Sequence, residues 1–471
     1  MHVALLSRAL LILALAAGQI SAVRAAERTA GTLPLPASGV LGVEDAQLVP
    51  DFWIARLEHP DAPVLTPAEI REANARLLRL EPSLHDLAAL PRTLPRRTVL
   101  GWIDGVSAAP RGPLFNAEGQ RYADVTIAGW RQSLALERIP EQVTPRFGLI
   151  VERAPLRAFP TELRAFDEPG DVDIDRFQET AEFPGTPVAV VHESADGRWL
   201  FVLSPRYAAW VQRDLVALGT RAEVLDYASR APFRVVTGAR VESVYTPEAP
   251  QVSRREFDMT TRLPLASGLA PDRPVNGQTA QAAWPVVLPV RGEEGALAFK
   301  TALMQKNADT ADGYLPLTRA NLIRQAFKFL GERYGWGHDY DGRDCSGFVS
   351  EVYASMGVLL PRNTSRQAIS PGLEHRLFGP ADSHADRVAA AMALRVGDLV
   401  YIPGHVMLVI GNLHGQPYVI HDVSGMRYRR DDGTTADVKL NAVSVTPLLP
   451  MLYGESDTFV DHMTSIVRIR R

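Results

Sequence analysis

The sequence predicts a protein of the α+β class, in which a helical N-terminal segment and two small β-barrels precede a C-terminal domain of helices and strands. Three observations support this. A helix-start signature occurs near residue 66, and short apolar segments separated by turn residues follow from about residue 145. From about residue 318 helical and strand-like segments alternate. At roughly 150 residues per domain, 471 residues suffice for about three domains with cores of their own.

The composition indicates a globular protein. Hydrophobic residues make up 46% of the chain, too many for a disordered one. The formal charge of −4 and the absence of a basic cluster argue against a nucleic-acid partner. Cys345 is the only cysteine, which excludes intrachain disulfides and cysteine-rich zinc sites. The acidic loop formed by His338, Asp339, Asp341 and Asp344 lacks the spacing of a zinc or calcium site. We therefore expect neither a metal nor another cofactor.

The first 26 residues have the pattern of a secretory signal peptide. Arg8 precedes an apolar run of nine residues, and Val23-Arg24-Ala25 is a small-residue cleavage site. The run is shorter than the ~20 residues that cross a bilayer, and no later segment approaches that length, so we expect no membrane span. An exported protein, periplasmic or extracellular, meets oxidising conditions. There the unpaired Cys345 has to be either buried or used.

The mature N-terminal region, residues 27–135, is predicted to be mainly helical. Thr66-Pro-Ala-Glu69 is a capping box with proline at the first helical position. The residues behind it place apolar side chains near helical spacing.

Two β regions follow this segment. The first, residues 136–222, contains apolar strands punctuated by turns such as Ser194-Ala-Asp-Gly197, and it predicts a small barrel. The second, residues 223–295, shows a weaker pattern of the same kind. The strands expected are Phe147–Val151, Pro187–Val191 and Trp199–Val202 in the first region, and Phe233–Val236 and Trp284–Leu288 in the second.

The C-terminal domain, residues 300–471, is predicted to begin with a helix from about Thr318 that stops at Gly331. Apolar residues at helical spacing also follow Cys345, which places this cysteine at the N-terminus of a second helix. Unpaired backbone N–H groups at that position lower a thiol pKa, so we expect a reactive thiolate. The alternative is an inert, buried cysteine.

Two histidines favour the reactive interpretation. The strands Val396–Ile402, His405–Ile410 and Pro417–His421 are expected, with a turn at Gly411–Gly415. His405 and His421 are then centred on residue 413 and lie nearly opposite on one face of a hairpin, with Cβ atoms about 4.5–5.5 Å apart. A one-residue slip would separate them onto opposite faces. Cys345 would be the nucleophile, His405 the base and His421 the orienting group. We expect five other histidines, His192, His375, His384, His414 and His462, on the surface or in loops.

A set of motifs around these residues closely resembles the NlpC-type (NlpC/P60) cell-wall cysteine peptidases. The motifs are Tyr334-Gly-Trp-Gly337, Asp344-Cys-Ser-Gly-Phe-Val349, Leu360-Pro-Arg-Asn-Thr-Ser-Arg-Gln367, Gly397-Asp-Leu399, Gly404-His-Val406 and Ile420-His421. The resemblance implies a papain-like catalytic domain in which Cys345, His405 and His421 have the roles given above. The upstream region resembles a branch with two SH3-type barrels, well for the first barrel and weakly for the second.

In that branch the first barrel leans over the active site. The resemblance implies that Tyr207, Asp344 and Ser346 bind the free amino terminus of the substrate, together with a barrel glutamate, either Glu179 or Glu193. An ammonium group needs such carboxylate and hydroxyl partners. The activity implied is hydrolysis of the γ-D-glutamyl–diamino acid bond of peptidoglycan stem peptides, by a monomer. The alternatives are a non-catalytic peptidoglycan-binding protein, and an acyltransferase or amidase on the same fold.

Overall fold

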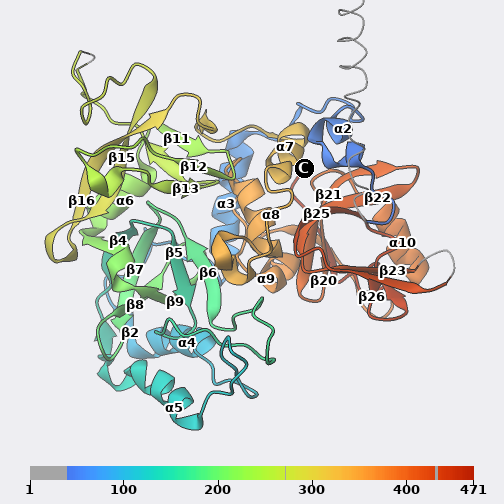
Figure 1. Ribbon diagram of the computed structural model, residues 1–471, viewed down its shortest axis with the longest axis horizontal. Helices are drawn as coiled ribbons and strands as arrows, with labels where there is room; N and C mark the ends of the chain where they lie inside the picture. Colours follow the sequence, from blue (N-terminus) through green and yellow to red (C-terminus); the bar gives the residue numbers. More distant parts are fainter. Residues whose placement is uncertain (1–39, 271, 430–432, 471) are drawn as a thin grey trace, which may run out of the picture.

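The computed structural model describes residues 40–270, 272–429 and 433–470 (Figure 1). The expected signal peptide lies outside these residues. The model confirms the α+β class: a helical N-terminal segment, two β regions and a mixed C-terminal domain follow one another along the chain. Within the described ranges, no helix combines the length and the apolar character needed to cross a bilayer.

The N-terminal segment contains the predicted helix. Thr66 caps α3 and accepts a hydrogen bond from the Glu69 backbone N–H, while the Glu69 carboxylate accepts one from the Thr66 backbone N–H, which confirms the capping box. The elements are α2 (Pro50–Ile54), β1 (Pro63–Leu65), α3 (Pro67–Leu80), β2 (Leu94–Pro95), α4 (Arg96–Val106) and α5 (Asp124–Ser133).

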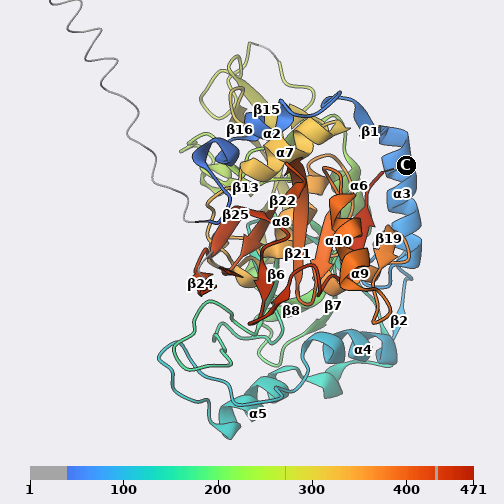
Figure 2. The ribbon, with the colours of Figure 1, turned by 90° about the vertical axis from the view of Figure 1, so that its right-hand side faces the viewer.

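This segment contacts two parts of the molecule. On α3, the Asn74 side chain bonds the backbone of Gly357 and Leu359 in the C-terminal domain at 2.8 and 2.9 Å. After α4, the Ser107 hydroxyl accepts a hydrogen bond from the Trp210 indole of the first β region. Figure 2 shows α3 alongside the C-terminal domain and α4 and α5 below it. The segment therefore braces the C-terminal domain against the first β region.

The first β region is a seven-stranded sheet with the order β10-β4-β7-β8-β9-β5-β6. Apolar side chains are buried on both of its faces, and the three strands predicted here are confirmed as β4, β7 and β8. The strands are β4 (Arg146–Ile150), β5 (Ala154–Arg157), β6 (Gln178–Glu182), β7 (Pro187–Glu193), β8 (Trp199–Leu203), β9 (Ala208–Gln212) and β10 (Val216–Gly219); β3 (Gln142–Val143) pairs with β2.

The second β region extends further along the chain than predicted. Strands β16 and β17 pair with β15 and β11, so the region continues to Asp312, and the expected boundary near residue 295 falls in the β15–β16 turn. The glycine-bearing, charged segment Gly292–Gly295 is the turn of the β15–β16 hairpin. The elements are α6 (Arg221–Ser229), β11 (Phe233–Val236), β12 (Arg240–Glu242), β13 (Glu256–Asp258), β14 (Arg262–Pro264), β15 (Ala283–Arg291), β16 (Leu297–Gln305) and β17 (Thr310–Asp312).

The C-terminal domain is built on a six-stranded sheet, β19-β28-β20-β21-β22-β25. Helices α7 and α8 pack on one face and α10 on the other. The elements are β18 (Leu317–Thr318), α7 (Arg319–Phe327), α8 (Cys345–Ala354), α9 (Thr364–Ile369), β19 (Glu374–Leu377), α10 (His384–Met392), β20 (Leu399–Ile402), β21 (His405–Leu413), β22 (Gln416–Val423), β23 (Met426–Arg429), β24 (Thr435–Val438), β25 (Ala442–Pro447), β26 (Leu452–Tyr453), β27 (Asp457–Thr458) and β28 (Ser465–Arg468).

The register of the β21–β22 hairpin differs from the prediction. Gly411–Leu413 belong to β21, and the turn is His414-Gly415, so the two histidines are offset along the strands instead of directly opposite. Val409 pairs with Val419 but Gly411 with Tyr418, which makes Ile410 the extra residue of a β-bulge. If Ile410 were absent, the strand pairing found next to the turn would continue along both strands. His421 would then lie on the opposite face of the sheet from His405. The bulge returns both to one face.

The first β region meets the C-terminal domain at the loop preceding Cys345. Strand β6 runs against the segment Trp336–Asp341, and the Gln178 side chain donates to the Gly337 carbonyl at 2.8 Å. Gly337 has φ +57°, and a Cβ there would lie 2.6 Å from the Gln178 carbonyl oxygen. Only glycine allows this approach.

Gly337→Ala tests that close approach. We expect it to lower the free energy of unfolding by more than the roughly 1–2 kcal/mol of left-handed strain, because the added methyl group also pushes β6 away. Gly331→Ala is the matched control, since Gly331 has φ +82° with nothing within 4 Å of its Cβ position. Equal losses for the two variants in chemical denaturation would contradict the close contact.

Candidate active site

Cys345 is the first residue of α8, as predicted. Its side chain is 5% exposed. The sulfur lies 3.7 Å from the Thr364 hydroxyl and 4.0 Å from the Gly404 carbonyl oxygen. Because Gly404 directly precedes His405, the thiol lies against the turn that begins β21.

The predicted low thiol pKa is wrong. Burial, together with the nearby Asp344 carboxylate, raises the pKa of the Cys345 thiol to about 12, although the Thr364 hydroxyl and the Val406 N–H act in the opposite direction. Desolvation of a thiolate here outweighs the helix N-terminus. The thiol is therefore protonated at neutral pH and needs a base before it can attack.

The two histidines form a hydrogen-bonded pair. His405 Nε2 and His421 Nδ1 are 2.7 Å apart, and His421 Nε2 lies 2.9 Å from the Thr446 hydroxyl on β25. Burial lowers the pKa of His405 to about 4 and that of His421 well below its ordinary value. Both rings are neutral at pH 7, so His405 is in the form that can accept a proton.

Thr446 can set the tautomers of this pair. When His421 donates from Nε2 to the Thr446 hydroxyl, its Nδ1 accepts the Nε2 proton of His405. His405 Nδ1 then keeps a lone pair that can accept a proton. Thr446 was not among the sequence predictions, because strand pairing alone brings β25 beside β22.

Asp344 is held by Arg362, which lies in the Leu360–Gln367 motif and for which no role was predicted. The Arg362 guanidinium donates to both Asp344 oxygens, at 3.1 and 2.7 Å, and to the Ser346 hydroxyl at 2.9 Å. Asp344 also accepts the backbone N–H groups of Gly337 and Gly347. Burial alone would raise the pKa of Asp344, but Arg362 lowers it to about 2. Asp344 is thus ionised and caps α8.

A hollow of about 570 Å³, the thiol-side hollow, opens beside the sulfur. It brings together the predicted residues Tyr207, Asp344, Cys345 and Ser346. Tyr207 donates from its hydroxyl to the Glu179 carboxylate at 2.5 Å, and Glu179 also lines the hollow.

Glu193, the other predicted barrel glutamate, lies elsewhere. It pairs with Arg146 and with Arg213, and it lines a separate surface depression. Of the two candidates, Glu179 therefore lines the same hollow as Cys345 and Glu193 does not.

A second hollow of about 840 Å³, the histidine-side hollow, contains His405 but not Cys345 among its lining residues. The two hollows share four residues, Tyr334, Ile402, Pro403 and Gly404, which form a ridge between them. A molecule bound across this ridge would contact the thiol on one side and the imidazole on the other.

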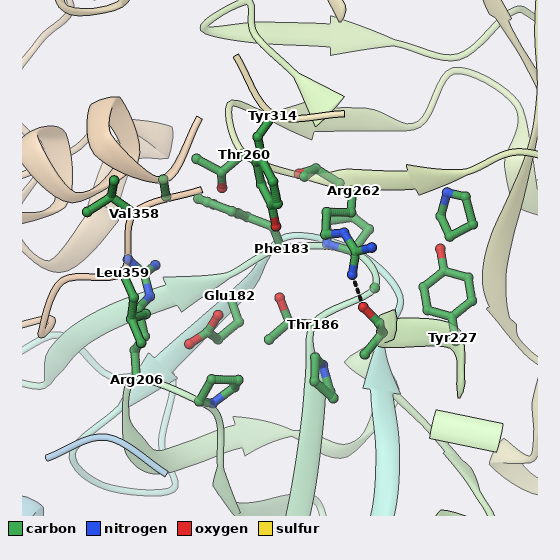
Figure 3. Close-up of a pocket in the computed structure, with 18 of the residues that line it drawn as sticks. Glu182, Phe183, Thr186, Arg206, Tyr227, Thr260, Arg262, Tyr314, Val358 and Leu359 are labelled. Atoms are coloured by element: carbon green, nitrogen blue, oxygen red, sulfur yellow. Dashed lines mark hydrogen bonds between the residues drawn. The ribbon is translucent and has the colours of Figure 1, made fainter. Parts of the chain in front are cut away.

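A third hollow, of about 240 Å³, lies where the two β regions meet the end of α8 (Figure 3). Glu182, Arg206 and Leu359 border it, and Arg262 donates to the Ala228 carbonyl at its edge. Neither Cys345 nor the histidine pair lines it, so it lies apart from the candidate site.

The five histidines expected on the surface or in loops divide into two groups. His384 and His414 are exposed and His462 lies in a turn, as predicted. His192 on β7 and His375 on β19 are half-buried strand residues, so the surface or loop prediction is wrong for these two. In the parts of the chain that the structure describes, no group of three or more His, Cys, Asp or Glu side chains is arranged to hold a metal ion.

Comparisons with known proteins identify two of the domains. Residues 331–436 match the NlpC/P60 family and residues 164–212 match an SH3 domain of the SH3b1 type. The C-terminal part of the chain is therefore an NlpC/P60-family domain, and it is preceded by an SH3 domain. A solved NlpC/P60 endopeptidase from Photobacterium damselae subsp. piscicida has the same fold, with a TM-score of 0.67 at 16% identity over 84% of this chain and 90% of that one.

Two curated relatives are similar in sequence. The chain is 33% identical over 119 residues to the probable endopeptidase p60 of Listeria welshimeri, a match that spans 24% of this chain and only 19% of the relative. It is 26% identical over 262 residues to dipeptidyl-peptidase 6 of Lysinibacillus sphaericus, which covers 53% of this chain and 87% of the relative.

Arg362→Gln tests the electrostatic support of the site. Removing the cation leaves a buried Asp344 carboxylate unpaired, which should lower the free energy of unfolding at pH 7 by about 3–5 kcal/mol. In the wild type the ionised Asp344 contributes to the free energy of unfolding at pH values above the ordinary pKa of 3.8. That contribution is lost as the pH falls towards 2. The deficit of the variant should therefore be smaller at pH 3 than at pH 7 in denaturant titrations.

The double variant Arg362→Gln/Asp344→Asn is the control, because it buries no unpaired charge. It should recover part of the stability at pH 7. A deficit that is the same at both pH values would show that Arg362 acts by packing alone.

Proposed function

We propose that the protein is a cysteine endopeptidase that hydrolyses the bond between γ-D-glutamate and the diamino acid in peptidoglycan stem peptides with a free N-terminal L-alanine. The observation that carries this proposal is the position of Cys345, which lines a hollow shared with the Glu179 carboxylate and lies against Gly404, the residue before His405 of the His405–His421 pair. The NlpC/P60 domain and the names of the relatives, endopeptidase p60 and dipeptidyl-peptidase 6, support the same chemistry. This substrate agrees with the export predicted from the N-terminal sequence.

In the first step His405 Nδ1 takes the thiol proton as the sulfur of Cys345 attacks the γ-carbonyl carbon of the substrate. The tetrahedral intermediate collapses to a thioester when the imidazolium gives that proton to the leaving amine. His405 then removes a proton from water, which attacks the thioester carbonyl. Return of the proton to the sulfur regenerates the thiol and releases the dipeptide acid. His421 keeps the imidazole oriented throughout.

The proton transfer to the leaving amine also determines the orientation in which the substrate binds. The imidazolium must protonate the leaving nitrogen, so the leaving residue belongs on the His405 side of the ridge. The acyl part, L-Ala-γ-D-Glu, then occupies the thiol-side hollow. Tyr334 lies on the ridge, and burial raises the pKa of its hydroxyl, which therefore stays protonated. That hydroxyl and the N-terminal N–H groups of α8 are the donors available to a developing oxyanion.

The thiol-side hollow suits a free ammonium group. Burial raises the pKa of Glu179, which means that its carboxylate lacks full compensation, although Tyr207 and Arg362 oppose the shift. A substrate ammonium in hydrogen-bond reach of Glu179 would supply that compensation. In intact wall the L-alanine nitrogen is acylated by the muramyl lactyl group and carries no charge. We therefore infer that released peptides, and not uncleaved sacculi, are the substrate.

Cys345→Ala should abolish the activity. Purified protein incubated with L-Ala-γ-D-Glu-diaminopimelate should release L-Ala-γ-D-Glu, and the variant should be slower by at least about a thousandfold. Whole sacculi assayed in parallel should release no peptide. Undiminished hydrolysis by Cys345→Ala would overturn the assignment of the nucleophile, and binding of peptide without release by the wild type would favour a non-catalytic binding protein.

Glu179→Gln and Glu193→Gln form a matched pair that tests the ammonium site. Loss of the Glu179 charge should raise KM for the free-amine tripeptide about tenfold or more, the range for a hydrogen bond to a charged group. Glu193→Gln should leave KM unchanged, because Glu193 pairs with Arg146 and Arg213 away from Cys345. Similar KM values for both variants would contradict the pocket.

A further inference from the structure

The histidine-side hollow is built jointly by the SH3 domain and the C-terminal domain. One wall is the loop Gly170–Ile174, which connects β5 to β6 in the first β region. The opposite walls come from the start of β21 and from the segments that carry Arg333 and Lys439. The Tyr340 hydroxyl donates to the Val172 carbonyl at 2.6 Å and so fixes the loop against the loop preceding Cys345.

The charged groups of this hollow gather at one place. Arg333 and Lys439 both donate to the carboxylate of Asp173, at 2.8 and 3.1 Å, one to each oxygen. Two cations therefore share one anion. Their side chains are 63% and 73% exposed, so N–H donors remain accessible to a ligand. The hollow's other carboxylate, Asp171, accepts the backbone N–H of Asp173 at 3.0 Å.

We propose that Arg333 and Lys439 bind a free carboxylate of the leaving residue and thereby select which peptides are cleaved. The inference rests on the proposed function, which places that residue in this hollow beside His405. A guanidinium and an ammonium that converge on one point form a strong carboxylate site. Asp173 holds both cations at the wall and by itself balances one of their two positive charges. Asp171 lies on the same loop, where it can accept a side-chain ammonium of a diamino acid.

Two carboxylates of the leaving residue could occupy this site. One is the α-carboxylate at the end of a tripeptide. The other is the side-chain carboxylate of a diamino dicarboxylic acid such as diaminopimelate. Arg333 and Lys439 would bind either carboxylate through the same contacts, so the two possibilities have to be distinguished by comparing substrates.

The test compares kcat/KM for three peptides that share L-Ala-γ-D-Glu. The leaving residue is L-lysine, L-lysine amide, or diaminopimelate amidated at its α-carboxyl group. The wild type should cleave at least one carboxylate-bearing peptide about tenfold or more faster than the lysine amide peptide. A preference for the lysine peptide identifies the α-carboxylate as the recognised group, and a preference for the diaminopimelate amide identifies the side-chain carboxylate.

Arg333→Gln and Lys439→Gln should each remove most of this preference and leave kcat/KM for the lysine amide peptide unchanged. Arg79→Gln, which removes an equally exposed cation from α3, is the matched control and should change nothing. Thermal unfolding checks that each variant is folded. Equal cleavage of all three peptides by the wild type, or equal losses on every peptide in the variants, would overturn the carboxylate site. Failure of the wild type to cleave any of the peptides would instead overturn the proposed function.

Discussion

The buried Arg362 guanidinium is the group on which the geometry of the site depends. It is 3% exposed and holds both oxygens of Asp344, the N-cap of α8, and so fixes the helix start that carries Cys345. Its Nε donates to the Thr180 hydroxyl on β6 at 2.6 Å. A single cation therefore anchors the nucleophile and the first β region to each other. An uncompensated charge of either sign at this depth would cost several kcal/mol.

The network continues from Arg362 into the second β region. His338 lies between Arg362 at 3.0 Å and Glu351 at 2.7 Å, and burial keeps its pKa well below the ordinary value, so it joins the two as a neutral ring. Glu351 and Asp258 on β13 both bond Arg343, which is fully buried. Side chains from three parts of the chain thus share one buried set of alternating charges. Removing one partner would leave the next group buried and unpaired. The positions of these three parts relative to one another and to the site are therefore fixed together.

Local signals were sufficient for much of this architecture. The Thr66 capping box predicted α3, and the apolar stripe after Cys345 predicted α8, because both depend on neighbours within one or two turns. The β-bulge at Ile410 could not be predicted, since nothing in the local pattern distinguishes an extra residue from a longer strand. The partnership of Arg362 with Asp344 joins side chains eighteen residues apart, and only the folded loop brings them together. The thiol pKa was misjudged for the same reason: burial is a tertiary property.

Burial also explains how an unpaired cysteine can persist where oxidation is expected. The thiolate is the species that oxidants attack, and the environment of Cys345 keeps the sulfur protonated, with its pKa raised to about 12. His405, with its pKa lowered to about 4, has little tendency to take that proton on its own. Under the proposed function a substrate would change this balance, since its ammonium group would add positive charge beside the thiol while the oxyanion donors engage its carbonyl. Activation would then be coupled to occupancy of the thiol-side hollow, and the same desolvation that disfavours a free thiolate would protect the sulfur between turnovers.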